Sequence, residues 1–402
     1  MNVLVVNCGS SSIKYSLLRM HNHESGEVLA SGLVEKIGNP PSRLKHKAGD
    51  KSDSRDVPAP DHRAAFAVMM QALAEGPAAV IAGPAQIQAV GHRVVHGAER
   101  FTGSVRVDAD VIKALEDFST LAPLHNPPNL VGIREAMHLM PGATHVAVFD
   151  TAFHQTLPPH AYLYALPYDL YAQHRIRRYG FHGTSHRYVT EATAHLLGRP
   201  LAETNVITAH LGNGCSMAAV AGGKSVDTSM GMTPLEGLVM GTRSGDVDPG
   251  LVLHLIRSLG KTFDQIDGLL NRQSGLLGIS GVSNDMREVV DAAAAGNTRA
   301  DLAVEIFCYR IKKYVGAYTA VLGRVDALVF TGGIGENAAG IRERACRGLE
   351  GIGYVLDALR NSAAARGPRD VSADGSPHRI LVIPTDEEMM IARDTARIAG
   401  GG

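Results

Sequence analysis

Two apolar runs flank a short polar turn at the start of the chain. Residues 3–6 are all apolar, residues 7–12 (NCGSSS) are small and mostly polar, and apolar side chains resume at Ile13, Tyr15 and Leu17. Both flanks are rich in strand formers, so the pattern predicts a β-hairpin. Hydroxyls, backbone N–H groups and a lysine would meet at its tip, which suits phosphate oxygens. An ordinary Ser-rich turn explains the same composition.

Hydrophobic spacing predicts the next elements of the first half. Strands are expected over 28–37, 88–96 and 145–149, and a helix capped by Asp61 is expected to run to about residue 76. Residues 38–60 are polar, charged and Pro-containing, so this stretch is predicted to be a surface excursion.

The second half of the chain repeats the hydrophobic and polar pattern found at the start of the chain. Residues 205–210 and 215–220 are apolar runs around the turn 211–214, which predicts a second hairpin with a phosphate-friendly tip. Two such hairpins suggest a duplicated fold whose halves face each other across a cleft. The later predicted helices and strands are 251–259, 298–322, 327–330 and 379–383, followed by a closing helix.

Composition narrows the class of protein. With 402 residues, 45% of them hydrophobic and 20% charged, the chain predicts a globular protein of two domains. A net charge of −1 gives no indication of nucleic acid or an anionic membrane as partner. The four cysteines form no CxxC pair, and neither a signal peptide nor a long apolar run is present, so a cytoplasmic location is expected.

Two charged residues stand out against apolar surroundings. Arg93 lies within a predicted strand, where it needs an anionic partner, either a salt bridge or a ligand. Asp150 follows the strand 145–149, at the end where α/β sheets bind ligands, although capping the next turn is an alternative role.

Several motifs allow more than one interpretation. His182 and His186 have the spacing of a metal pair, but Gly183 replaces the glutamate of the zinc protease pattern. The sequence at 223–225 (GKS) looks like the end of a Walker A loop, yet Ala218 stands where its first glycine would fall, so a hairpin turn is the better interpretation.

Three further turns, rich in glycine or in acidic residues, are candidate functional sites. The run 332–337 lies between a buried strand and a helix predicted from Ala338, which favours a nucleotide site and also satisfies a loose dinucleotide fingerprint. The loop 241–250 is dense in loop formers around Arg243, and such loops often carry function. The carboxylates at 386–388 could cap the last helix or hold a metal.

Eight segments in one order resemble the acetate and butyrate kinase family. They are VNCGSSSIKY at 6–15, GHRVVHG at 91–97, FDTAFH at 149–154, YGFHGTSH at 179–186, AHLGNG at 209–214, TRSGDVDPG at 242–250, GGIGEN at 332–337 and TDEE at 385–388. The resemblance covers essentially the whole chain. It implies an α/β fold of two similar ribonuclease H-like (actin-like ATPase) domains facing an interdomain cleft.

The resemblance also implies an activity and its partners. Residues 1–151 with 387–402 would bind the acid and phosphate, and residues 152–386 would bind the nucleotide. The reaction would be reversible in-line transfer of the ATP γ-phosphoryl group to acetate, giving acetyl phosphate and ADP, with Mg²⁺, or Mn²⁺ in its place. ATP would be the co-substrate, the enzyme a cytoplasmic homodimer without nucleic acid or membrane partners, and propionate stays open as an alternative acid.

Residue roles follow from the same resemblance. Arg243 and His182 would stabilise the transferring phosphoryl group, and Arg93 would hold the carboxylate of the acid. A carboxylic acid is already ionised at neutral pH, so Asp150 is expected to orient an arginine or metal-bound waters, although an acid/base role is the alternative.

The remaining implied sites are sets of residues. Mg²⁺ would be held by Asn7 and Glu387. The methyl group of acetate would face Val95, Leu124, Phe181 and Pro234. ATP would be bound by Ser10, Ser12, Lys14, His210, Leu211, Gly212, Asn213, Gly214, Asp285, Met286, Arg287, Gly333, Ile334, Gly335, Glu336 and Asn337.

Two rival functions come from other classes of protein. An ATPase switch of the Hsp70 kind would need an appended peptide-binding domain, and the last motif lies close to the end of the sequence. A dehydrogenase would use the fingerprint at 333–338 with Asp357, but that fingerprint normally opens a domain and here lies late in the chain.

Overall fold

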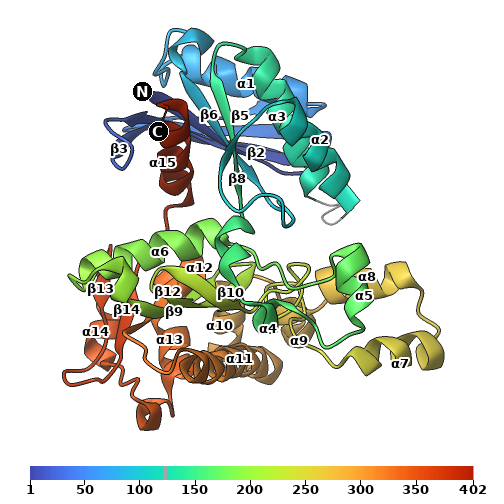
Figure 1. Ribbon diagram of the computed structural model, residues 1–402, viewed down its shortest axis with the longest axis vertical. Coiled ribbons are helices and arrows are strands. Elements are labelled where there is room, and N and C mark those ends of the chain that lie inside the picture. Colours follow the sequence, from blue (N-terminus) through green and yellow to red (C-terminus); the bar gives the residue numbers. More distant parts are fainter. Residues whose placement is uncertain (121–124, 402) are drawn as a thin grey trace. The chain divides into compact units, whose positions relative to one another are not determined.

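The computed structural model describes residues 1–120 and 125–401. Within it the chain forms two compact units, each coloured by sequence in Figure 1. Unit 1 comprises Met1–Phe153 and Asp386–Gly402, and unit 2 comprises His154–Thr385. In the described residues no helix is long and apolar enough to cross a membrane.

Unit 1 is an eight-stranded sheet with helices on both faces. Its strands are β1 (Asn2–Cys8), β2 (Ser12–Met20), β3 (Gly26–Glu35), β4 (Ser42–Ala48), β5 (Lys51–Val57), β6 (Ala89–Val94), β7 (Val105–Arg106) and β8 (Thr144–Phe149). Its helices are α1 (His62–Ala74), α2 (Ala109–Asp117), α3 (Asn126–Leu139) and α15 (Glu387–Ala399), with short 3₁₀ turns at Pro84–Gln86 and Phe118–Thr120.

The strand order of this sheet is β5-β4-β3-β2-β1-β6-β8-β7. The predicted opening hairpin is confirmed, because β1 and β2 pair antiparallel with Asn7 opposite Lys14. β1, β6 and β8 run parallel, so their carboxyl ends share one edge of the sheet.

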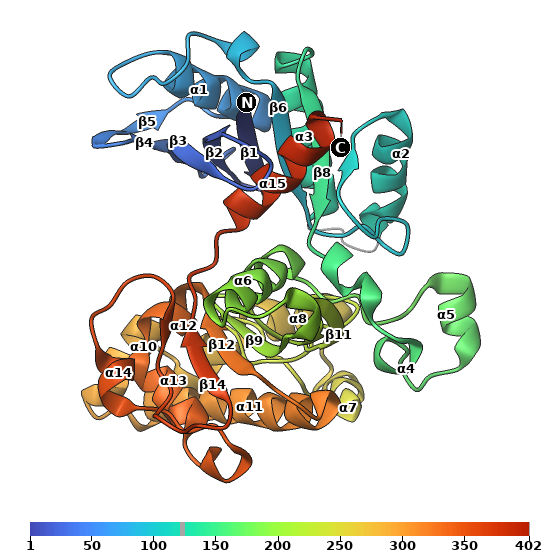
Figure 2. The ribbon, with the colours of Figure 1, turned by 60° about the vertical axis from the view of Figure 1, so that its left-hand side comes forward.

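Alternation along β1 decides which helix each side chain meets. Leu4 and Val6 belong to a core shared with α1 and α3, whereas Val3 and Val5 belong to a core shared with α15. Figure 2 shows α15 lying across one face of the sheet. Gly91 of β6 permits this close packing, because a Cβ there would lie 2.3 Å from Thr395 Oγ1.

Residues 38–60 contain two strands that were not predicted. These residues form the antiparallel hairpin β4–β5, which extends the sheet next to β3. In β4 the buried positions are Ser42, Leu44 and His46, so the alternation of a strand is present but only one buried residue is aliphatic. His46 is buried because its Nδ1 hydrogen-bonds the Tyr15 hydroxyl at 2.8 Å.

Unit 2 contains a six-stranded sheet and most of the helices. Its strands are β9 (Asn205–Leu211), β10 (Cys215–Ala221), β11 (Lys224–Thr228), β12 (Ala327–Thr331), β13 (Arg369–Asp370) and β14 (Arg379–Val382). Its α-helices are α4 (Pro159–Tyr162), α5 (Tyr168–His174), α6 (Gly183–Leu196), α7 (Pro249–Leu259), α8 (Phe263–Arg272), α9 (Gly275–Ser280), α10 (Met286–Ala294), α11 (Thr298–Leu322), α12 (Gly332–Asn337), α13 (Ala339–Cys346) and α14 (Ala358–Ser362). Its 3₁₀ turns are Ala152–Thr156, which begins in unit 1, Leu201–Glu203 and Glu350–Ile352.

The second sheet repeats the plan of the first. Its order is β11-β10-β9-β12-β14-β13, with β11, β10 and β9 antiparallel and β9, β12 and β14 parallel. The corresponding strands of unit 1 are β3, β2, β1, β6 and β8. The predicted fold class, two similar α/β domains of the ribonuclease H-like type, is therefore confirmed, and the predicted cleft stays a prediction.

The glycine-rich run 332–337 differs from expectation. It was predicted to be a turn before a helix starting near Ala338, but it is itself the short helix α12. Glu336 reaches back so that its Oε1 accepts hydrogen bonds from Gly332 N (2.9 Å) and Thr385 N (3.2 Å). A carboxylate from the chain therefore occupies these backbone donors, and a dinucleotide phosphate loop is not formed here.

Candidate active site

Four polar side chains of unit 1 lie on the α15 face of the sheet, near the carboxyl ends of its parallel strands. Asn7 continues the series Val3–Val5 in β1, and Lys14 lies opposite it in β2. Arg93 has the same parity in β6, and Asp150 directly follows β8. The period of two in each strand thus brings the residues of three predicted motifs to one place.

Arg93 and Asp150 form a bidentate ion pair. Arg93 Nε donates to Asp150 Oδ1 at 2.9 Å, and Nη2 donates to Oδ2 at 2.7 Å. The Asp150 side chain is 2% exposed and that of Arg93 is 22% exposed. Burial alone would lower the pKa of Arg93, but the charge of Asp150, with that of Glu387, offsets it and raises the pKa. Arg93 is therefore a cation whose plane is fixed by Asp150 and whose side chain stays partly exposed.

The first turn of α15 adds two carboxylates. Glu387 Oε2 lies 3.9 Å from Arg93 Nε, and Glu388 forms an ion pair with Lys14. Burial, followed by the charges of Asp150 and Glu388, raises the pKa of Glu387, although Arg93 opposes the shift. Negative charge is thus concentrated at a site that a cation would stabilise.

Asn7 and Glu387 line one small cavity of about 20 Å³, together with Lys14 and Arg93. This volume is about that of one bound water. An amide oxygen and a carboxylate are ligands that Mg²⁺ accepts, and Mg²⁺ usually keeps several waters. The donor set fits the predicted metal, although no cluster of three or more His, Cys, Asp or Glu able to hold a metal occurs among residues 1–120 and 125–401.

The hairpin tip of unit 1 carries the predicted hydroxyls. Ser10 is exposed between the strands, and Ser12 begins β2. The tip is closed by a hydrogen bond from Gly9 N to Ser12 O at 2.8 Å. The serine hydroxyls therefore lie on the same hairpin as Lys14.

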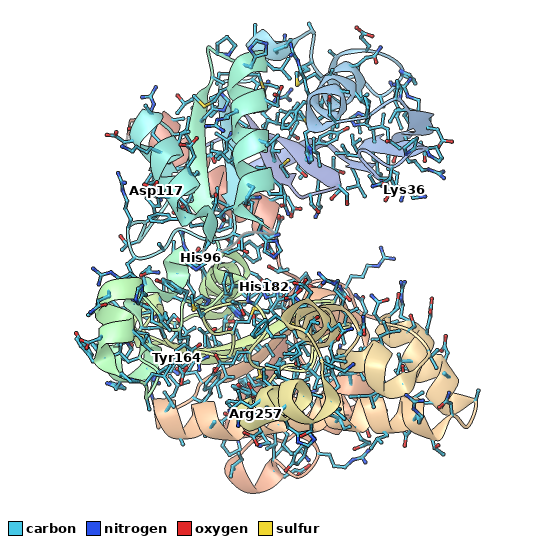
Figure 3. All side chains as sticks on the ribbon, turned by 90° about the vertical axis from the view of Figure 1, so that its right-hand side faces the viewer. Lys36, His96, Asp117, Tyr164, His182 and Arg257 are labelled. Carbon is cyan, nitrogen blue, oxygen red and sulfur yellow. The ribbon has the colours of Figure 1, made fainter. Side chains whose placement is uncertain are left out.

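Unit 2 brings His182, His210 and Arg243 together around the second hairpin tip. His182 precedes α6 with a φ of 55°, its ring stacks on that of His210 at 4.4 Å, and Figure 3 shows it on unit 2. A Cβ on Gly214 would lie 3.5 Å from His182 Nε2 and 3.7 Å from Arg243 Nη1. The absence of a side chain at Gly214 leaves both groups near one point.

Arg243 is a half-buried cation held by uncharged groups. Its Nη1 donates to Pro234 O at 2.9 Å and lies 3.4 Å from the sulfur of Met240. Burial lowers its pKa. No carboxylate in the described part of the chain lies within ion-pair distance, so an anion such as a phosphoryl group would supply the missing charge.

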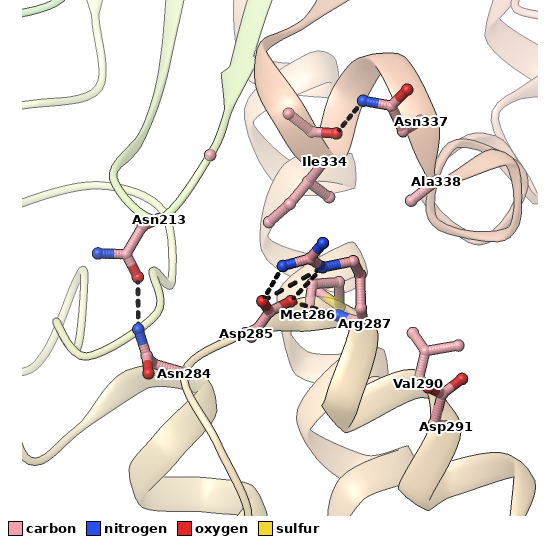
Figure 4. Close-up of a pocket in the computed structure, with 12 residues that line it drawn as sticks. Asn213, Asn284, Asp285, Met286, Arg287, Val290, Asp291, Ile334, Asn337 and Ala338 are labelled. Atoms are coloured by element: carbon pink, nitrogen blue, oxygen red, sulfur yellow. Dashed lines mark hydrogen bonds and ion pairs between the residues drawn. The ribbon is translucent and has the colours of Figure 1, made fainter. Parts of the chain in front are cut away.

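A pocket of about 670 Å³ lies beside the same hairpin tip (Figure 4). This size suits a nucleoside. Its lining includes the predicted residues Gly212, Asn213, Asp285, Met286, Arg287, Gly333, Ile334 and Asn337. Asp285 caps α10 and holds Arg287 through Oδ2 at 2.5 Å, so this part of the wall is an ion pair.

The residues that line the pocket differ in part from the predicted ATP set, which stays a prediction. Asn284, Val290, Asp291 and Ala338 line it and were not predicted. Asn284 could have been suspected from its place in the polar loop before α10, and it donates to Asn213 Oδ1 at 3.0 Å. Gly335 and Glu336 are not among its lining residues, because Gly335 faces Phe330 and Glu336 bonds Gly332 N.

Three further predicted ATP residues lie outside the pocket lining. Leu211 is fully buried in β9, whereas His210 hydrogen-bonds Ser185 and Gly214 lies between His182 and Arg243. These three residues are therefore placed at the hairpin tip rather than around the nucleoside pocket.

The predicted wall for the methyl group is divided between the units. Val95 is half-buried in unit 1, where its N–H donates to Asn129 Oδ1 at 3.0 Å. Phe181 is buried and Pro234 half-buried in unit 2. Leu124 lies outside the described residues. The wall stays a prediction.

The alternative of a His182–His186 metal pair is not supported. His186 is fully buried, and both of its ring nitrogens hydrogen-bond hydroxyls, Thr208 at 2.7 Å and Ser216 at 2.7 Å. His186 is therefore part of the interior of unit 2.

Two units whose sheets share a common set of strands in the same order, with a nucleoside-sized pocket, a half-buried arginine and an arginine–carboxylate pair, indicate the actin-like ATPase class of nucleotide-dependent enzyme. The model of the acetokinase family matches residues 2–393, and the chain belongs to that family.

Individual relatives resemble the chain over almost its full length. A protein of Clostridium botulinum (strain Loch Maree) named acetate kinase is 52% identical over 399 residues, covering 99% of each chain. The crystal structure of Porphyromonas gingivalis acetate kinase aligns with a TM-score of 0.94 at 49% identity, over 99% of each chain. A structure titled as a propionate kinase from Francisella tularensis aligns with a TM-score of 0.92 at 45% identity, over 99% of each chain.

Proposed function

We propose that this protein is an acetate kinase, which transfers the γ-phosphoryl group of ATP to acetate and gives acetyl phosphate and ADP in a reversible reaction. The observation that carries the proposal is the 52% identity, over 99% of both chains, with a protein named acetate kinase. A structural neighbour titled as a propionate kinase supports a short carboxylic acid as the substrate class. Relatives named acetate kinase support acetate as the preferred acid.

Arg93 would bind the carboxylate of acetate. An arginine has five N–H donors in one plane, and Asp150 uses two of those on Arg93, at Nε and Nη2. The other three donors stay available in a plane that Asp150 fixes, which suits a second carboxylate. Acetate is already ionised at neutral pH, so Asp150 acts as a positioning residue and no general base is required.

Arg243 and His182 would stabilise the phosphoryl group during transfer. Negative charge is spread over three equatorial oxygens in that transition state, and donors fixed in advance stabilise it best. Both side chains approach one point above Gly214, and Arg243 has a carbonyl rather than a carboxylate as its partner. Ser10, Ser12 and Lys14 would contact phosphate from the first hairpin.

Asn7 and Glu387 would hold Mg²⁺, which when bound neutralises phosphate oxygens; Mn²⁺ is proposed as a substitute because it accepts the same oxygen ligands. The adenosine of ATP would occupy the pocket between the hairpin tip of unit 2, α10 and α12. Unit 1 would thus supply the acid and metal sites, and unit 2 the nucleotide site.

We propose a homodimer as the functional assembly. Large apolar side chains are exposed on α7 and α8, with Phe263 82% and Leu259 61% exposed. Strongly exposed apolar side chains on two successive helices are consistent with an interface. Sedimentation should give twice the chain mass, and Phe263→Asp should reduce it; a monomeric wild type would contradict the proposal.

A hydroxylamine trap tests the activity. Incubation with ATP, Mg²⁺, acetate and hydroxylamine should give acetohydroxamate, because only an acyl phosphate reacts in this way. Omission of acetate and the variant Arg243→Ala provide the controls. ATP hydrolysis without hydroxamate would favour the ATPase switch, and NAD reduction by a hydroxy acid without hydroxamate would favour the dehydrogenase.

A further inference from the structure

Ser216 of β10 lies between two histidines of unit 2. Its Oγ is 2.9 Å from His182 Nδ1 and 2.7 Å from His186 Nε2. The other nitrogen of His186, Nδ1, lies 2.7 Å from Thr208 Oγ1. Ser216, His186 and Thr208 are all completely buried. A continuous series of hydrogen bonds therefore leads from the core of the sheet to the side chain proposed to contact the phosphoryl group.

His186 is neutral in this series. Burial, together with the neighbouring His154 and His210, lowers its pKa well below the ordinary histidine value. A neutral imidazole has one N–H and one lone pair, and a hydroxyl has one proton. If Ser216 accepted from both rings, its own buried proton would have no partner among these groups. Every proton of the series is used only when the hydrogen bonds all run in one direction or all in the other.

The distances around Thr208 favour one direction. Thr208 Oγ1 lies 2.7 Å from His186 Nδ1 but 3.4 Å from the carbonyl oxygen of Ala218. The second distance exceeds that of a normal O–H···O bond, so the Thr208 hydroxyl is better placed to donate to His186 Nδ1. His186 Nε2–H then donates to Ser216, and the Ser216 proton is directed to His182 Nδ1.

We propose that Ser216, held by His186 and Thr208, fixes His182 in the neutral form that carries its proton on Nε2. This inference rests on the proposed function, because it gives His182 a donor for a phosphoryl oxygen without adding a charge. In the reverse direction a neutral His182 would present a lone pair to the phosphoryl group, and only the protonated ring could donate. Ser216 is thus a positioning residue that acts through His182.

The surroundings of His182 agree with a neutral ring. The titratable and charged groups near it include His186 of the helix α6 that His182 precedes, His154 against His186, His210 of β9, and Arg243. Arg243 is a permanent cation near the same point above Gly214, so a second positive charge on His182 would be opposed before phosphate binds.

Nitrogen-15 NMR of histidine-labelled protein tests the inference directly. At pH 8 the His182 signals, identified by their loss in His182→Gln, should show a protonated Nε2 and an unprotonated Nδ1. Ser216→Ala should raise the population protonated at Nδ1. A wild type protonated at Nδ1 would overturn the inference, whether or not the protein phosphorylates acetate.

Kinetics provide the second readout. Ser216→Ala should lower kcat at pH 8 on the order of tenfold to a hundredfold, with the KM values for acetate and ATP nearly unchanged. The loss should shrink at pH 6, because a protonated ring carries a proton on Nε2 in either case. An equal loss at both pH values would contradict the inference.

Two variants separate positioning from folding. Ser229 is equally buried and accepts a hydrogen bond from Met217 N at 2.8 Å, so Ser229→Ala should alter stability without this pH dependence. Thr208→Val keeps the shape of the side chain but removes its proton, and it should shift the activity in the same direction as Ser216→Ala with a smaller amplitude. If Ser216→Ala does not fold, a pH-independent Thr208→Val would still refute the inference.

Discussion

Replacing Asp150 with asparagine tests the proposal that Asp150 positions Arg93 for acetate binding and takes no part in the chemical step. An asparagine at this position can accept one hydrogen bond from Arg93 through its oxygen, but its NH₂ group would face Arg93 Nη2, which is now 2.7 Å from Asp150 Oδ2. One charge-assisted bond is lost, and with it the charge that fixes the guanidinium plane. Glu387, 3.9 Å from Arg93 Nε, then becomes the competing partner.

The size of the effect follows from the bond that is lost. A hydrogen bond to a charged group contributes about 1.5–3 kcal/mol, which corresponds to roughly a tenfold to 150-fold decrease in kcat/KM for acetate. Most of the decrease should be in the KM for acetate, because Arg93 is proposed to hold the carboxylate, and the KM for ATP should change little.

Initial rates of hydroxamate formation at varied acetate and ATP measure these constants. Asp326→Asn is the matched control, because Asp326 is another buried aspartate paired with an arginine, Arg199, at 2.6 Å, and its loss should affect stability alone. If Asp150→Asn lowers kcat by several orders of magnitude and leaves the acetate KM unchanged, Asp150 acts in the chemical step and the reasoning is refuted.

The remaining predictions concern other parts of the site. Arg93→Ala should raise the acetate KM, whereas Arg243→Ala should lower kcat, on the order of several hundredfold, at similar KM; steady-state kinetics check this, and a near-normal kcat in Arg243→Ala would contradict it. Glu387→Gln should raise the Mg²⁺ concentration required for half-maximal rate, and Glu388→Gln should not, so equal titrations would leave α15 without a metal role. Because burial raises the pKa of Glu387, the folded protein binds a proton at this side chain more tightly than the unfolded protein does. The contribution of this proton to the free energy of unfolding is present below the ordinary pKa of 4.5 and is lost as pH rises through the raised pKa. Melting temperatures of Glu387→Gln should therefore exceed those of wild type at neutral pH, with the difference vanishing below about pH 4.5. Val95→Ala should improve kcat/KM for propionate relative to acetate. The change should stay within the roughly 1–3 kcal/mol by which a hydrophobic pocket discriminates one methylene, and an unchanged ratio would mean that Val95 does not contact the methyl group.

Local patterns predicted much of the fold because the elements concerned are periodic. The run of residues 298–322 is a helix with those bounds, and the opening hairpin pairs as expected. The hairpin β4–β5 was missed because His46 fills a core position that sequence reasoning assigns to apolar residues. His46 is satisfied there by Tyr15, 31 positions earlier in the chain. A hydrogen-bond partner that far away in the sequence leaves no signal in the hydrophobic periodicity of the strand.

The candidate site shows the same limit. Arg93 and Asp150 could each be singled out from apolar surroundings, but their bidentate contact depends on the parallel register of β6 and β8, 57 positions apart in sequence. Glu336 was assigned to ATP by the family resemblance, as part of the run 333–337, and that role stays a prediction. Its bond to Gly332 N is local, within four residues, and could have been suspected as a reach-back cap.

The position of α15 has a consequence for how the protein is made. Unit 1 is built from both ends of the sequence: the sheet comes first, and the helix that covers Val3, Val5 and Val148 is translated only after unit 2. Roughly 230 residues of unit 2 intervene, which is about 12 to 46 s of synthesis at about 5–20 residues per second. During that time the nascent sheet exposes an apolar face on the ribosome, where a chaperone could cover it. Glu387 arrives with the covering helix, so the proposed metal site can be completed only when this face is closed.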